Sequence, residues 1–169
     1  GRTIRDLYRS CVCAACHHAV VAHDIVFFLA PDDDAVSAMR GRRPGPEFDS
    51  VTCRFIEPDS AIAVWDMYFE EPSTEVPTPE QLHGRWPRWV TAPVNDGVEV
   101  FALSRRLTRA LADAGSTELE ELVGRWTTRL RDEDGDDMTD DDLQMVLREV
   151  SRRAAAAVST GGRLYSWSF

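Results

Sequence analysis

The clearest hydrophobic pattern of the chain runs over residues 139–158. Its apolar residues recur at the spacing of one helix face, and the set comprises Leu143, Val146, Leu147, Val150, Ala154, Ala157 and Val158. Thr139 and Asp142 have the spacing of a capping box, and Gly161 follows the last apolar residue. The sequence therefore predicts a long amphipathic helix, with Met145 outside its buried stripe.

Three apolar segments predict strands. Residues 24–30 read Asp-Ile-Val-Phe-Phe-Leu-Ala, which is typical of a strand that is buried on both faces and lies inside a sheet. Residues 48–56 predict a second strand. Residues 163–169 alternate between apolar and other side chains, as a terminal strand would.

A hairpin is predicted further along. Residues 88–94 and 98–103 flank Asn95-Asp96-Gly97, a sequence that favours a tight turn with positive φ. Proline cannot donate a hydrogen bond to a neighbouring strand, so Pro93 indicates that its strand lies at an edge of the sheet.

Cap residues predict shorter helices. Asp32 precedes a short helix, and Ser104 precedes a longer one that ends at Gly115. Thr117 and Glu120 have the spacing of another capping box, which predicts that the next helix begins there.

Residues 58–69 fit two structures. In a helix opened by Pro58, the side chains that share a face are Ala61, Ile62, Trp65, Tyr68 and Phe69. In a strand paired with residues 48–56, the alternating set is Ala61, Ala63, Trp65, Met67 and Phe69. The helix is slightly favoured, and the hairpin stays open.

The length of 169 residues and a hydrophobic content of 43% suit one domain with a substantial core. Residues 1–22 lack periodicity, and we expect them to be an N-terminal extension that is either disordered or not native. Residues 23–169 are expected to form a single α+β domain, in which a small mixed or antiparallel sheet packs against several amphipathic helices.

The formal net charge of -10 argues against binding to nucleic acid or to an anionic membrane surface. No apolar run approaches the roughly 18 to 20 residues that span a bilayer, and no secretory signal can be recognised. We therefore expect a cytoplasmic protein with no membrane association.

Three segments carry a resemblance. They are Ala30-Pro31-Asp32-Asp33-Asp34, residues 100–111 and residues 162–167. Together they resemble a group of small, acidic, uncharacterised actinobacterial proteins, over about residues 23–169. The resemblance implies one cytoplasmic α+β domain and no particular activity.

The N-terminal segment contains a cluster of metal-binding residue types. Cys13-Ala14-Ala15-Cys16-His17 matches the attachment pattern of c-type haem, and Cys11 and His18 add ligands that could complete a zinc site. No second ligand cluster is recognisable downstream. A chance match in an extension is therefore favoured, and no cofactor is expected.

The acidic run over residues 132–137 does not fit a calcium-binding EF-hand. When Gly135 occupies the sixth position of the loop, Leu130 falls at the first ligand position and Asp141 at the twelfth. A solvated loop before a helix explains these charges.

Residues 70–85 are rich in proline and glutamate and predict a loop. Directly after it, Trp86 and Trp89 lie close to Arg85 and Arg88, and tryptophan and arginine are typical of interface hot spots. The alternative is that both indoles complete the core. We expect a non-enzymatic binding or regulatory module that recognises a protein partner through its acidic surface and through these four residues. The alternative is a redox or metal protein that uses Cys11, Cys13, Cys16 and His17.

Overall fold

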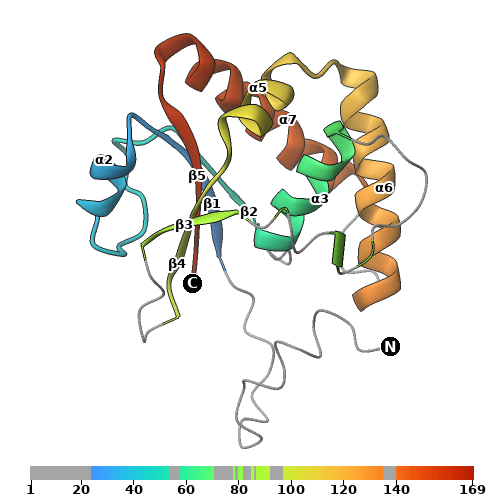
Figure 1. The fold of residues 1–169 in the computed structure, drawn as a ribbon, viewed down its shortest axis with the longest axis horizontal. Coiled ribbons are helices and arrows are strands. Elements are labelled where there is room, and N and C mark those ends of the chain that lie inside the picture. The colour runs from blue at the N-terminus through green and yellow to red at the C-terminus, as the bar shows by residue number, and fades with distance from the viewer. Residues whose placement is uncertain are drawn as a thin grey trace, which may run out of the picture.

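The computed structural model describes residues 24–53, 58–70, 78, 80–81, 85, 87–91, 97–134 and 140–169 (Figure 1). Over these ranges the chain forms a single α+β domain with one antiparallel sheet, as predicted. The predicted N-terminal extension lies outside the described residues.

The sheet has five strands in the described part of the chain: β1 (Ile25–Ala30), β2 (Ser50–Cys53), β3 (Arg88–Thr91), β4 (Glu99–Ala102) and β5 (Arg163–Ser168). Their spatial order is β2-β1-β5-β4-β3, and every neighbouring pair is antiparallel. The predicted hairpin is confirmed by the pairing of β3 with β4, and β3 is an edge strand as Pro93 indicated. The last strand of the chain therefore lies at the centre of the sheet.

The helices cover the two faces of the sheet unequally. They are α2 (Asp33–Ser37), α3 (Pro58–Glu70), α5 (Arg105–Asp113), α6 (Ser116–Asp134) and α7 (Asp140–Thr160). Helices α3, α5, α6 and α7 lie on one face and the short helix α2 lies on the other (Figure 1). The structure thus settles the ambiguity of residues 58–69 in favour of the helix.

The larger core lies between the sheet and the four helices on its first face. It is centred on Trp65 of α3, whose ring meets Trp126 of α6 edge-on at 5.2 Å between centroids and lies 5.5 Å from Phe27 of β1. All three side chains are fully or almost fully buried. Aromatic pairs in this edge-to-face geometry are favourable beyond the area that they bury.

A smaller core lies on the face covered by α2. Phe28 of β1 stacks on Tyr165 of β5 at 5.5 Å, and Val36 of α2 packs against the same cluster. Because successive side chains of a strand point to opposite faces, β1 and β5 contribute to both cores. This explains why residues 24–30 are apolar almost throughout.

Helix α7 follows its predicted stripe with one exception. Leu143, Val146, Leu147, Val150, Ala154 and Ala157 are buried, and Met145 is 56% exposed as expected. The prediction was wrong for Val158, which is 46% exposed. Residues 159–161 are exposed as well, so the last turn of α7 projects beyond the elements that could cover it.

The start of α6 also differs from its prediction. The N–H of Leu119 donates to the C=O of Gly115, so the first helical hydrogen bond begins at Gly115. Thr117 therefore lies within the first turn and not at a cap. Gly115 both follows α5 and precedes α6, and the connection is shorter than the capping-box pattern suggested.

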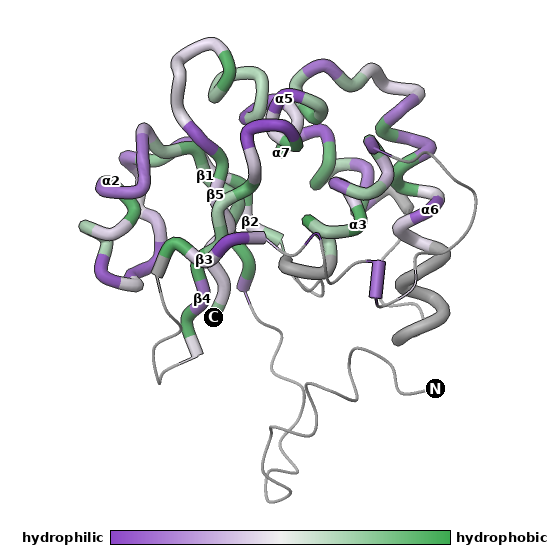
Figure 2. The backbone as a smooth tube through the Cα atoms, in the orientation of Figure 1, coloured by the Kyte–Doolittle hydropathy of each residue, from purple (hydrophilic) through white to green (hydrophobic). Residues whose placement is uncertain are grey.

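Figure 2 shows hydrophilic and hydrophobic residues alternating along the helices, as expected for elements that are buried on one face. None of the helices described here combines the length and the apolar character needed to cross a membrane.

Candidate functional site

Several elements meet at one end of the sheet. Strand β4 ends at Ala102, which is paired with Arg88 at the start of β3 and with Tyr165 near the start of β5. The start of β5, Arg163, is paired with Ala30 at the end of β1. Helices α2 and α5 both begin just beyond this end, after β1 and β4 respectively.

The first turn of α5 is held by Ser104. This residue is extended, and its Oγ accepts a hydrogen bond from the N–H of Leu107 at 3.1 Å. The Thr108 hydroxyl donates to the Ser104 carbonyl at 2.8 Å, which adds a second side-chain hydrogen bond to the same turn. The predicted cap is confirmed, and it places Arg105 and Arg106 at the first two positions of the helix.

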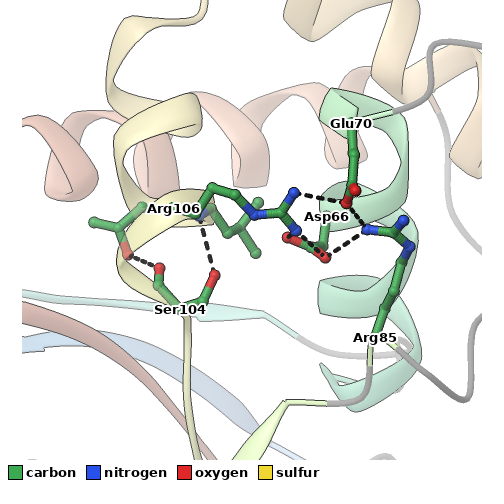
Figure 3. A network of polar contacts seen from close by, with 7 residues as sticks. Asp66, Glu70, Arg85, Ser104 and Arg106 are labelled. Atoms are coloured by element: carbon green, nitrogen blue, oxygen red, sulfur yellow. Dashed lines mark hydrogen bonds and ion pairs between the residues drawn. The ribbon is translucent and has the colours of Figure 1, made fainter.

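Two carboxylates of α3 face Arg106 of α5 and Arg85 (Figure 3). Asp66 and Glu70 lie one helical turn apart. Arg106 donates from Nη2 to both oxygens of Asp66, at 2.7 and 2.8 Å, and from Nη1 to Glu70 at 2.6 Å. Arg85 donates to Asp66 at 3.2 Å and also to Glu70. Two arginines and two carboxylates therefore form one connected network.

The network shifts the pKa values of Glu70, Arg85 and Arg106. Hydrogen bonds from Arg85 and then Arg106 lower the pKa of Glu70 to about 2. The same hydrogen bonds with Glu70 raise the pKa of both arginines. Asp66 has a side chain that is only 12% exposed, so the network is sheltered at Asp66 and open to solvent at Glu70.

A second network lies on the other side of the sheet end. Asp33 of α2 accepts hydrogen bonds from the Tyr165 hydroxyl at 2.8 Å and from Nη2 of Arg88 at 2.9 Å, while Nη1 of Arg163 lies 3.7 Å away. The Tyr165 hydrogen bond is the main cause that lowers the pKa of Asp33. Burial, and then the hydrogen bond with Asp33, raises the pKa of Tyr165.

Between the two networks lies a pocket of about 380 Å³. Five arginines line it, and we call it the arginine pocket: Arg85, Arg88, Arg105, Arg106 and Arg163. The rest of its described lining is Ile62, Asp66, Pro87, Ala102, Ser104 and Leu107. Such a concentration of guanidinium groups is unexpected in a chain whose formal net charge is -10.

The structure brings two of the four predicted interface residues into this pocket. Arg85 and Arg88 both line it, although Arg85 is bound to α3 and Arg88 to α2. Trp89 does not line the pocket: its ring lies 6.0 Å from that of Phe101, its partner on β4 and a member of the large core. Trp89 is 46% exposed, so its indole is not part of that core. Trp86 lies outside the described residues.

Sequence reasoning missed Arg105, Arg106 and Arg163. A signal was nevertheless present in Ser104-Arg105-Arg106, because a helix N-terminus favours acidic residues and α5 has none in its first turn. Arginines in the first turn of a helix are unfavourable locally, and such exceptions are expected at functional sites, where the side chains are needed for another purpose. No local sequence pattern indicates that Arg163 lines the pocket, because its position depends on the pairing of β5 with β1 and β4.

The candidate metal ligands Cys11, Cys13, Cys16 and His17 lie outside the described residues. Within the described ranges, no group of three or more His, Cys, Asp or Glu side chains is placed to hold a metal ion. Cys53 is buried, and desolvation raises the pKa of its thiol to about 12.

Comparison with protein-family models, with curated proteins and with solved structures finds no match to this chain.

Proposed function

We propose that this protein is a non-enzymatic binding module that recognises a protein partner at the arginine pocket and the adjoining Trp89. The observation that carries the proposal is the exposure of Trp89, which directly follows a pocket residue, Arg88, on an edge strand. A half-exposed indole and an exposed guanidinium at successive positions of β3 are residue types whose truncation often weakens an interface.

The state of Asp66 supports binding in preference to proton transfer. It is the acidic side chain in the described lining of the pocket, and both of its oxygens accept hydrogen bonds from Arg106. One of those oxygens also accepts from Arg85. A carboxylate so occupied orients the arginines and is poorly placed to take a proton from a substrate.

The rigidity of the surroundings also supports a preformed binding surface. The ends of β3, β4 and β5 fix the backbone on one side, and α3 and α5 are joined by the Arg106 ion pairs on the other. Side chains that are already held in place lose less conformational entropy when a partner binds.

The proposal is tested by capturing a partner from a lysate of the source organism and identifying it by mass spectrometry. Trp89→Ala should weaken the binding of that partner by about 2 kcal/mol, as for a hot-spot residue. Met145→Ala is the matched control, because Met145 is a similarly exposed apolar side chain on α7. It should leave the affinity unchanged.

Circular dichroism separates a lost contact from a lost fold. Because Trp89 is half exposed, Trp89→Ala should keep the wild-type spectrum. Equal affinity of wild-type protein and Trp89→Ala for the identified partner would contradict the proposed surface. Turnover of a substrate by the wild-type protein would contradict the non-enzymatic assignment.

A further inference from the structure

We propose that the arginine pocket binds a phosphomonoester group, carried as a phosphorylated side chain by the protein partner. This inference rests on the proposed function, because it names the chemical group through which the partner is recognised. It is motivated by the charge balance of the pocket, by the position of Arg105 at the start of α5 and by the arginines that other elements place around the same space.

The charge balance favours a dianion. Among the described residues, the carboxylates that pair with the pocket arginines are Asp33, Asp66 and Glu70. Five guanidinium groups against three carboxylates leave two positive charges. A phosphomonoester carries about -1.5 to -2 at pH 7, whereas a carboxylate carries only one negative charge. A phosphate group therefore matches the excess better.

Over the ranges that the structure describes, Arg105 is the pocket arginine for which no carboxylate is a partner. It is the first residue of α5, its side chain is exposed, and it has no hydrogen bond or ion pair within the described part of the chain. A cation there faces the positive end of the helix dipole, which is unfavourable. Its neighbour Arg106 is compensated by Asp66 and Glu70. An anion in the pocket would compensate Arg105 in the same way.

The backbone of α5 adds donors at the same point. Ser104 Oγ accepts from the N–H of Leu107. The N–H groups of Arg105 and Arg106 precede the first residue that can bond within the helix, so they have no acceptor in the helix itself. Amide groups in this position are suited to phosphate oxygens. This feature supports the site only together with the arginine side chains around it.

The remaining arginines come from other elements and surround the same space. Arg88 uses Nη2 for Asp33, and its other nitrogens have no hydrogen-bond partner among the described residues. Arg163 contributes from β5, and its Nε is buried with no hydrogen-bond partner in the structure. The volume of about 380 Å³ lies within the range of sites that enclose small ligands, and so can hold a phosphorylated side chain.

The first test uses inorganic phosphate as the probe. Its binding is monitored by nuclear magnetic resonance in a titration at constant ionic strength. Phosphate should shift the amide signals of residues 105–107, and acetate at the same concentration should shift them far less. Arg105→Gln should weaken phosphate binding by about tenfold or more, the effect of losing one charge-assisted hydrogen bond. Because Arg105 is exposed and unpaired in the described structure, this variant should fold normally.

Arg109→Gln is the matched control. Arg109 is an exposed arginine of the same helix that lies outside the pocket lining, so the net charge changes equally. It should keep the wild-type phosphate affinity. Equal weakening by both variants would show that overall charge, and not the pocket, binds phosphate, and would overturn the inference. Binding of acetate as tightly as phosphate would overturn it too.

A final comparison identifies the source of the phosphate. The partner captured by the wild-type protein should lose affinity by about tenfold or more after phosphatase treatment, and Arg105→Gln should remove this dependence. If capture is lost in Trp89→Ala but is insensitive to phosphatase, the proposed function stands and this inference fails. If inorganic phosphate binds at residues 105–107 but phosphatase has no effect, a free phosphorylated compound is the ligand and the partner-borne group is excluded.

Discussion

Arg106 of α5 binds both carboxylate oxygens of Asp66 of α3, at 2.7 and 2.8 Å. The two residues are separated by 40 positions in the chain. A cation at the second position of a helix is locally unfavourable, and this ion pair offsets that cost through a contact that exists only in the folded protein. The predictions below follow from such contacts.

Glu70 should make stability depend on pH in the acidic range. The pKa of its carboxyl is about 2 in the folded protein and 4.5 ordinarily, so the unfolded chain binds the proton more tightly. The stabilisation is therefore fully present above the ordinary pKa and is lost as the pH falls from about 4.5 towards about 2. Urea unfolding at a series of pH values measures this loss.

Glu70→Gln should flatten the pH profile between these limits. Glu47→Gln is its control, because Glu47 is exposed and has no ion pair within the described residues. It should follow the wild-type profile. Identical profiles for wild-type protein and Glu70→Gln would argue against the network of Figure 3 in solution.

Leu147→Ala should lower the free energy of unfolding by about 2 to 5 kcal/mol, the range for emptying a core leucine site. Leu147 is fully buried in the stripe of α7 that packs on the sheet. Met145→Ala, on the exposed side of the same helix, should change it by no more than about 0.5 kcal/mol. Similar losses in both variants, measured by chemical denaturation, would disprove this orientation of α7.

Arg153→Leu should cost about 1 to 3 kcal/mol, because the buried Arg153 side chain donates to the Ser50 carbonyl at 2.6 Å and joins α7 to β2. Its partners Asp49 and Glu149 are 48% and 38% exposed, so solvent limits the penalty to this range. Arg152→Leu is the control, since Arg152 is exposed and also pairs with Glu149. Arg152→Leu should lower the free energy of unfolding by less than about 1 kcal/mol. Equal losses in the two variants would show that the hydrogen bond between Arg153 and the Ser50 carbonyl does not stabilise the fold.

The thiol of Cys53 should resist alkylation in the folded protein. Burial keeps its pKa at about 12, and the thiolate is the reactive form. Iodoacetamide at about pH 8, near the ordinary pKa of a cysteine, should therefore leave the Cys53 peptide unmodified until urea unfolds the chain. Mass spectrometry of the digested protein gives the extent of modification. Rapid labelling without urea would place Cys53 at the surface.

The main elements were predictable because their signals are local. The stripe of α7, the apolar run of β1 and the Ser104 cap each depend on side chains a few residues apart, and each is found in the structure. The two errors lie at element ends. Val158 continues the apolar stripe of α7, but no other described element covers it and it is exposed. Thr117 was predicted to cap α6, whereas the first hydrogen bond of that helix is accepted by the carbonyl of Gly115.

The candidate site was predicted only in part. Arg85 and Arg88 were selected for their proximity to Trp86 and Trp89 in the sequence, and both line the arginine pocket. The sequence did not show that Arg85 and Arg88 bind different carboxylates, nor that Trp89 packs beside Phe101 and does not line the pocket. Those facts depend on which side of β3 each side chain occupies and on what the opposite element offers.

The sequence by itself determined the α+β class, the long amphipathic helix, the interior strand and the hairpin, since hydrophobic periodicity and cap chemistry act within a few residues. Only the tertiary structure decided that β5 lies between β1 and β4, and this order places Arg163 beside the start of α5. Strand order is set by packing between segments far apart in the chain, which no local pattern records. Arg163 joins the other four arginines of the pocket as a consequence of that order.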